Sequence, residues 1–199
     1  MRLITWACTL LFTAFTGSAS AFDLDDLSQQ LAQPEVVRGT FVQEKHLRAL
    51  PKPLSSEGHY VMAREHGLLW TVDKPIAQRY RITAAGIERN VAGAWQTAQP
   101  QGASGRQNAL TLALLSGDQR RLSNDFDLQL SGTPNDWSLQ LVPRSMLLRQ
   151  VFSRIQLSGG ERINKIELDE TQGDRTVMRL VGAQVDTALS DTELHEFER

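Results

Sequence analysis

Apolar and polar residues alternate with a period of two along most of the chain after Pro34. Leu68, Trp70 and Val72, for example, are separated by residues that would point to the opposite face of a strand. The segments with this pattern are 37–41, 68–72, 80–82, 126–130, 137–141, 151–157, 163–169 and 175–181. Turn signals at 134–135, 159–160 and 172–174 separate the later ones. The pattern predicts a meandering antiparallel sheet of about eight to ten strands, not alternating strands and helices.

A helix is predicted near the start of this region. Leu24, Leu27 and Leu31 fall on one helical face. Asp23 is a suitable N-cap, and Pro34 ends the helix.

A second helix is predicted over residues 109–116, with Gly117 at its C-cap. It is apolar on nearly every side because four leucines surround it: Leu110, Leu112, Leu114 and Leu115. Residues 99–105, which precede it, contain no large apolar side chain. Two interpretations stay open: a lid that moves over the sheet, or a fixed plug in its core. With so few helices, the sheet must either fold on itself as a barrel or accept these helices on its concave face.

The composition is that of a globular domain, with 41% hydrophobic and 22% charged residues in a chain of 199. Its formal net charge of −2 argues against nucleic-acid binding, which needs a surplus of basic residues.

The first 21 residues have the order of a secretory signal peptide. Arg2 precedes an uncharged apolar run over residues 3–15, and the segment ends in Ala19-Ser20-Ala21. The run is shorter than the roughly 20 residues that span a bilayer. We expect cleavage after Ala21, export, and a single mature domain over residues 22–199.

Motifs for catalysis or metal binding are absent from the sequence. The four histidines, His46, His59, His66 and His195, lack the spacing of a metal site, and there is no Gly-x-Ser-x-Gly elbow or glycine-rich phosphate loop. We expect no enzymatic activity, cofactor or metal. An apolar curved sheet with few covering helices instead favours binding of an apolar ligand.

Four motifs follow one another along residues 24–182: Val37-x-Gly39-x-Phe41-x-Gln43; Gly58-His59-Tyr60-Val61-Met62-Ala63-Arg64, followed by Trp70 and Pro75; Leu114-Leu115-Ser116-Gly117-Asp118; and Trp137-x-Leu139-x-Leu141-x-Pro143. Their order and spacing resemble the LolA-like family of periplasmic outer-membrane lipoprotein carriers. The resemblance implies a mainly β fold, an incompletely closed antiparallel barrel of the LolA/LolB type covered by short helices. It also implies a monomer that takes acyl chains of a lipoprotein or other lipid from an inner-membrane transporter to an outer-membrane acceptor.

The resemblance also suggests roles for particular residues. Arg64 matches the family arginine that ties a closed lid through lid carbonyl oxygens. The resemblance and the apolar pattern together predict the ligand-binding and lid residues to be Arg64, Phe41, Tyr60, Leu68, Trp70, Leu110, Leu112, Leu114 and Leu115.

The chain departs from the family pattern at two places. Glu65 follows Arg64 where the family usually has proline, and it would compete for the guanidinium. The family's Pro-Pro-x-Gly-Val segment has no counterpart before Arg199. Two hypotheses therefore stay open: a carrier of acyl chains, or an accessory or sensor domain that binds a protein partner. A uniformly apolar cavity would favour the carrier.

The signal-peptide interpretation predicts an exported protein that begins at Phe22 and contains no thiol, since Cys8 is the single cysteine. The intact mass of protein secreted by an exporting host, with and without a thiol reagent, measures both. A retained Cys8 would contradict the prediction.

Overall fold

The computed structural model describes residues 22–98, 114, 115 and 119–198, which form one antiparallel sheet with short helices beside it. The strands are β1 (Val36–His46), β2 (Leu54–Ala63), β3 (Gly67–Lys74), β4 (Gln78–Thr83), β5 (Gly86–Val91), β6 (Ala94–Thr97), β7 (Phe126–Thr133), β8 (Asp136–Pro143), β9 (Phe152–Gly159), β10 (Ile163–Glu170) and β11 (Arg175–Asp186). The described helices are α1 (Leu24–Ala32), α3 (Gln119–Asp125), α4 (Met146–Arg149) and α5 (Asp191–Glu198).

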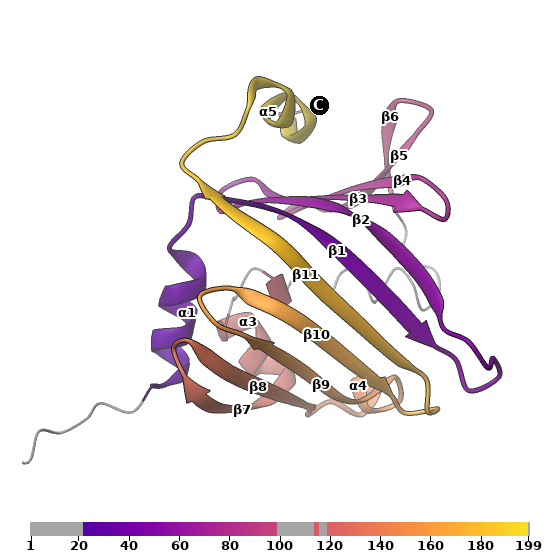
Figure 1. Cartoon of the computed structure of the whole chain (residues 1–199), viewed down its shortest axis with the longest axis vertical. Coiled ribbons are helices and arrows are strands. Elements are labelled where there is room, and N and C mark those ends of the chain that lie inside the picture. Colours follow the sequence, from indigo (N-terminus) through magenta and orange to yellow (C-terminus); the bar gives the residue numbers. More distant parts are fainter. Residues whose placement is uncertain (1–21, 99–113, 116–118, 199) are drawn as a thin grey trace, which may run out of the picture.

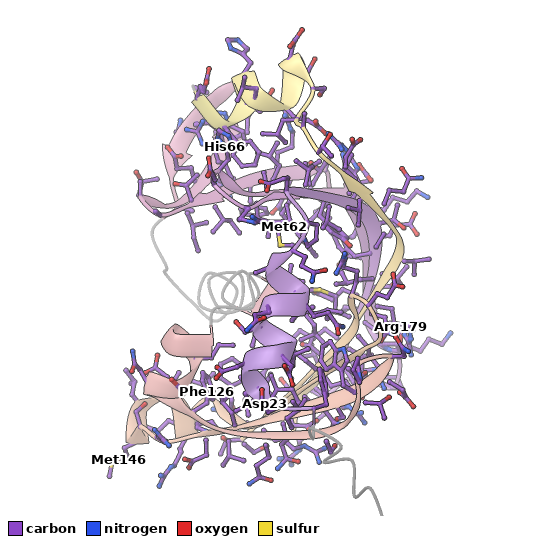
Figure 2. The ribbon with its side chains drawn as sticks, turned by 90° about the vertical axis from the view of Figure 1, so that its left-hand side faces the viewer. Asp23, Met62, His66, Phe126, Met146 and Arg179 are labelled. Carbon is purple, nitrogen blue, oxygen red and sulfur yellow. The ribbon has the colours of Figure 1, made fainter. Side chains whose placement is uncertain are left out.

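The sheet consists of two meanders joined at its centre. The strand order is β6-β5-β4-β3-β2-β1-β11-β10-β9-β8-β7, so the first and last strands of the chain pair with each other. β6 and β7 form the two outer edges of the described sheet, which is curved but not closed into a barrel. Figure 2 shows it as an open curve, with Met62 on one arm and Phe126 on the other.

Helix α1 lies on the concave side of this curve (Figures 1 and 2). Asp23 caps it, because its carboxylate accepts the backbone N–H groups of Asp25 and Asp26. Leu27 and Leu31 are buried in the same core as the inward-facing residues of the sheet. Among the described residues, none of the helices combines the length and apolar character needed to cross a membrane.

Glycines in β1 and β2 make room for aromatic rings on the concave face. Gly39 pairs with Tyr60, and Gly58 pairs with Phe41. A Cβ at Gly39 would come within 2.7 Å of the Tyr60 hydroxyl, and one at Gly58 within 1.9 Å of the Thr71 carbonyl oxygen and 2.9 Å of the Phe41 ring. Each ring therefore lies across a glycine of the neighbouring strand, which explains the Gly-x-Phe motif. Phe41 in turn stacks on Trp70 of β3, with ring centroids 3.8 Å apart.

The structure confirms the mainly β, incompletely closed fold and the helix after Asp23. The segments with a period of two all lie in strands, although β9 begins one residue after Val151. The expected total of eight to ten strands is too low, because the described residues alone form a sheet of eleven. The β5–β6 hairpin is short and has no fully buried residue, so it carries no clear alternation. Helices α3 and α5 contain too few apolar residues to show a helical period.

Two predicted segments fall wholly or partly outside the described residues. The signal segment, residues 1–21, is one of them. Of the second predicted helix, only Leu114 and Leu115 are described, and both are helical and buried.

Helix α5 is attached to the β1–β4 part of the sheet by arginines (Figure 1). Arg38 of β1 donates to both carboxylate oxygens of Glu193, at 2.7 and 2.6 Å. Arg81 of β4, which is buried, donates to the carbonyl oxygens of Glu196 and Phe197. Arg79 pairs with the Glu196 carboxylate at 2.8 Å.

Acid is expected to weaken this attachment. The hydrogen bonds from Arg38, with further ones from Ser190, lower the pKa of Glu193 from 4.5 to about 2. Because the pKa is lower in the folded protein, the stabilisation is complete above pH 4.5 and is lost as the pH falls towards 2. We predict that NMR signals of residues 191–198 shift towards unstructured positions over this range.

The variant Glu193→Gln should remove most of this pH dependence. Glu44→Gln is the matched control, since Glu44 pairs with Arg179 at 2.9 Å and its pKa is also lowered, chiefly by the Arg179 hydrogen bond. Signals of α5 that keep their positions down to pH 2 in the parent would contradict the prediction.

Candidate functional site

A small apolar cavity lies between α1 and the β7–β9 part of the sheet. Its described lining consists of eight leucines and one serine: Leu24, Leu27, Ser28, Leu31, Leu114, Leu122, Leu128, Leu139 and Leu157. Its volume is about 20 Å³, whereas pockets that enclose a small-molecule ligand measure roughly 300–1,000 Å³. In this state the leucines of the helices therefore fill the space over the sheet.

Among the described residues, α1, Leu114 and α3 cover the cavity. Leu114 is completely buried, and Leu122 of α3 is nearly so. On the opposite side, Leu139 and Leu157 lie on the inward faces of β8 and β9, where residues alternate between buried and partly exposed. The site thus has an apolar floor made by strands and an apolar roof made by short helices.

The aromatic residues of the other half of the sheet extend the same apolar core. Tyr60 lies 6.1 Å from Trp70, centroid to centroid, and both rings are buried. Burial raises the pKa of the Tyr60 phenol, so that this side chain stays neutral. The concave face therefore carries no charge at this position.

Polar contacts hold α1 against the turns that precede β8 and β10. The Gln30 side chain donates to the carbonyl oxygens of Gly160 and Pro134, at 2.7 and 3.1 Å. Arg162 donates in return to the carbonyl oxygen of Gln30 at 3.1 Å. Gln30, Pro134 and Arg162 also line a second, polar cavity. Water can therefore replace each of these hydrogen bonds when α1 moves away from the sheet.

Arg64 makes a comparable contact at the end of α1. Its guanidinium donates to the carbonyl oxygen of Gln33, the C-cap residue of α1, and pairs with Glu35 at 3.0 Å. The acidic partner of Arg64 is therefore Glu35 and not Glu65, the competitor expected from the sequence. α1 has no basic residue in its last turn, so Arg64 supplies the positive charge that favours a helix C-terminus. The predicted bond of Arg64 to carbonyl oxygens of a lid formed by residues 109–116 remains a prediction.

A second cavity, of about 680 Å³, lies on the outer side of α1 and is polar. Its described lining includes Phe22, Asp26, Gln29, Gln30, Gln33, Pro134, Glu161 and Arg162. Carboxylate, amide and guanidinium groups make it unsuitable for an apolar chain. In the described part of the chain, no group of three or more histidine, cysteine or acidic residues is placed to hold a metal ion.

Apart from Arg64, which contacts Gln33 and Glu35, the sequence-predicted site residues fall into three groups. Leu114 lines the cavity. Phe41, Tyr60, Leu68, Trp70 and Leu115 belong to the same core but are not among its described lining. Leu110 and Leu112 lie outside the described residues. The other eight lining residues were not predicted as site residues. Leu24, Leu27 and Leu31 carried a helical spacing, and Leu128, Leu139 and Leu157 alternate with polar residues in strands. Ser28 and Leu122 carried no signal.

Comparison with known families identifies the fold. The family model described as outer membrane lipoprotein carrier protein LolA-like matches residues 16–196. The chain belongs to the LolA-like family. Comparison with curated protein sequences finds no match.

Solved structures share the architecture of this LolA-like chain at low sequence identity. A MucB crystal structure is 17% identical, with a TM-score of 0.51 over 86% of this chain and 62% of MucB. MucB in complex with MucA(peri) is 16% identical, with a TM-score of 0.50 over 86% of this chain and 57% of that one. A LolA superfamily protein from Nitrosomonas europaea is 8% identical, with a TM-score of 0.49 over 86% of this chain and 97% of that one. This LolA-like chain therefore spans less than two thirds of MucB, and the MucB likeness concerns the fold.

Replacing Arg64 should loosen α1 without unfolding the sheet. Arg64→Leu removes the bond to Gln33 and the pair with Glu35. Because the side chain is 43% exposed, we expect a cost of about 0.5–1 kcal/mol and backbone hydrogen exchange in α1 about two- to fivefold faster.

Arg79→Leu is the matched control for this experiment. Arg79 is similarly exposed, at 45%, and pairs with Glu196 of α5 rather than with α1. Unchanged exchange of α1 in Arg64→Leu, or an equal effect of both variants, would contradict a holding role for Arg64.

Proposed function

We propose that this LolA-like protein is a periplasmic carrier that binds acyl chains of a lipoprotein or another lipid beneath its covering elements. In this proposal the chains pass from an inner-membrane donor to an outer-membrane acceptor. The signal-like residues 1–21 support export. The observation that carries the proposal is the leucine lining shared by the roof and the floor of the cavity.

Acyl chains suit this lining because their CH₂ groups can take the place of the leucine side chains of α1 against the sheet. When α1 moves away, Leu24, Leu27 and Leu31 leave apolar surface on β7–β9 exposed. A bound chain covers that surface again, at about 0.8 kcal/mol for each buried CH₂ group. The free energy of binding therefore compensates for the free energy of opening. No polar group is required, so the site would not distinguish one acylated ligand from another.

The cavity must enlarge before cargo enters. Its volume of about 20 Å³ has no room even for a short acyl chain. α1 can move without breaking any strand pairing, because hydrogen bonds at Gln30 and Gln33 attach it to the sheet. In this proposal, the described arrangement corresponds to the closed form of the carrier.

A second function, binding of a protein partner, is supported by the fold shared with MucB, whose structure in complex with MucA(peri) has been solved. In that case this chain would be an accessory or sensor domain, and its cavity would stay closed while a partner bound elsewhere.

A cleavable tether between α1 and the sheet tests the carrier proposal. The pair Gln30→Cys and Pro134→Cys places thiols at residues whose side-chain amide and carbonyl oxygen are 3.1 Å apart. We expect a disulfide-containing bismaleimide bridging them to abolish uptake of a fluorescent fatty acid, since a ligand binds in proportion to the open population. Reductive cleavage of the bridge should restore uptake.

The matched control is Arg154→Cys with Asp169→Cys, a cross-strand ion pair at 2.7 Å on neighbouring strands β9 and β10. Bridging these strands should leave uptake unchanged, because they already move together. Uptake by the α1-tethered protein equal to that of the control would exclude the carrier mechanism. No uptake by any form would favour the partner-binding function.

A further inference from the structure

Three connections meet at one end of the sheet, on the lower right of Figure 1. They are the β1–β2 connection, residues 47–53, the β10–β11 turn, residues 171–174, and α4 with its flanking residues, 144–150. Hydrogen bonds join them. Arg48 binds Asp174 through its backbone N–H at 3.0 Å and the Gln172 carbonyl oxygen through its guanidinium at 3.0 Å. The Thr171 hydroxyl donates to the Arg149 carbonyl oxygen at 2.7 Å. We call this surface, together with Leu54 at the start of β2, the α4 end.

Large apolar side chains protrude from the α4 end. Met146 and Leu147, on α4, are 79% and 74% exposed. Leu50 and Leu54, at the β1–β2 connection, are 45% and 53% exposed. Figure 2 places Met146 at the end of one arm of the curved sheet. Four such side chains on adjoining turns are more than the scattered exposed leucine that any soluble protein carries.

Basic side chains stand beside these apolar ones. Arg48, Lys52 and Arg149 are exposed, and no ion pair found among the described residues involves their side chains. Two nearby carboxylates pair with other cations, Glu170 with Lys45 at 3.2 Å and Asp127 with Arg144 at 2.6 Å. Asp174 accepts the Arg48 backbone N–H and keeps its negative charge, so it faces three basic side chains. The α4 end therefore presents apolar groups together with a surplus of positive charge.

We propose that the α4 end docks on the surface of an anionic phospholipid bilayer. Leucine and methionine side chains would enter the boundary between headgroups and acyl chains, while the arginines and the lysine stay among the phosphates. A bilayer suits this surface better than a protein does, because the apolar groups project from separate turns. A deformable interface accepts such projections, whereas a stable protein interface needs a continuous, complementary area of about 1,000 Å² or more.

Docking here would bring a covering element close to the bilayer. Arg144, directly before α4, donates through its backbone N–H to the Asp125 carbonyl oxygen at 2.8 Å and through its side chain to the Ser123 carbonyl oxygen at 2.9 Å. Both acceptors belong to the last turn of α3. The inference goes beyond the proposed function, because surface docking requires neither cargo nor an open cavity.

Flotation of the mature protein with vesicles tests the inference. We expect it to float with vesicles of phosphatidylethanolamine and phosphatidylglycerol, and to bind vesicles of phosphatidylcholine alone much more weakly. High salt should weaken the binding, since it screens the phosphate contacts. The double variant Leu50→Asp and Leu147→Asp should bind the anionic vesicles at least about tenfold more weakly than the parent does.

Val185→Asp is the matched control, because Val185 is 55% exposed and lies towards the other end of β11. It should float like the parent. The bridged variant with Gln30→Cys and Pro134→Cys should also float, so that failure of the carrier proposal and failure of this one are told apart. If the parent does not float with anionic vesicles, or the double variant floats as well as the parent, the inference is wrong. A protein partner would then be the alternative ligand of the α4 end.

Discussion

The pairing of β1 with β11 is the contact on which the rest of the structure depends. It joins the meander β1–β6 to the meander β7–β11 through ten residue pairs, from Val36–Asp186 to His46–Arg175. Without it, neither half would have a concave face large enough to enclose an apolar chain, because each would be an open sheet of five or six strands. The pairing also costs the most chain entropy to form, since its partners are separated by nearly the whole domain.

Once the sheet is curved, its concave face must be covered by something apolar. Short helices do this in the described state, through leucines that contact the leucines of β7–β9. A roof of separate short helices attached by a few hydrogen bonds opens at lower cost than a strand leaves a sheet. The same apolar surfaces can therefore serve as core in the closed protein and as the binding site proposed for the open one.

Arginines of the sheet and of its turns hold the helix ends. Arg64 and Arg162 reach the carbonyl oxygens of Gln33 and Gln30 in α1, and Arg81 reaches those at the end of α5. Neither an arginine nor a lysine lies in the last turn of α1 or α5. Because a guanidinium has several donors in a fixed plane, it can satisfy the terminal carbonyls of a helix and still pair with a carboxylate, as Arg64 does with Glu35.

The sequence alone determined eight of the eleven described strands, the first helix and the apolar character of the concave face, because these follow from local spacing. Trp137, Leu139 and Leu141 had to share a face whatever the strand paired with. The motifs around Phe41 and Trp70 also identified the family, although the stacking of these rings on paired glycines appears only in the fold.

Tertiary structure decided which leucines form the cavity and what Arg64 holds. Leu122 is no more conspicuous in the sequence than other leucines, and the alternation around Leu128 shows only that its face of the strand is apolar. Both line the cavity together with α1 only in the folded protein. Glu35 is distant from Arg64 along the chain, whereas Glu65 is its neighbour, yet β1 and β2 bring Glu35 into contact. Periodicity records which face of an element is apolar; what that face meets depends on strand order and curvature, which are set by long-range pairing.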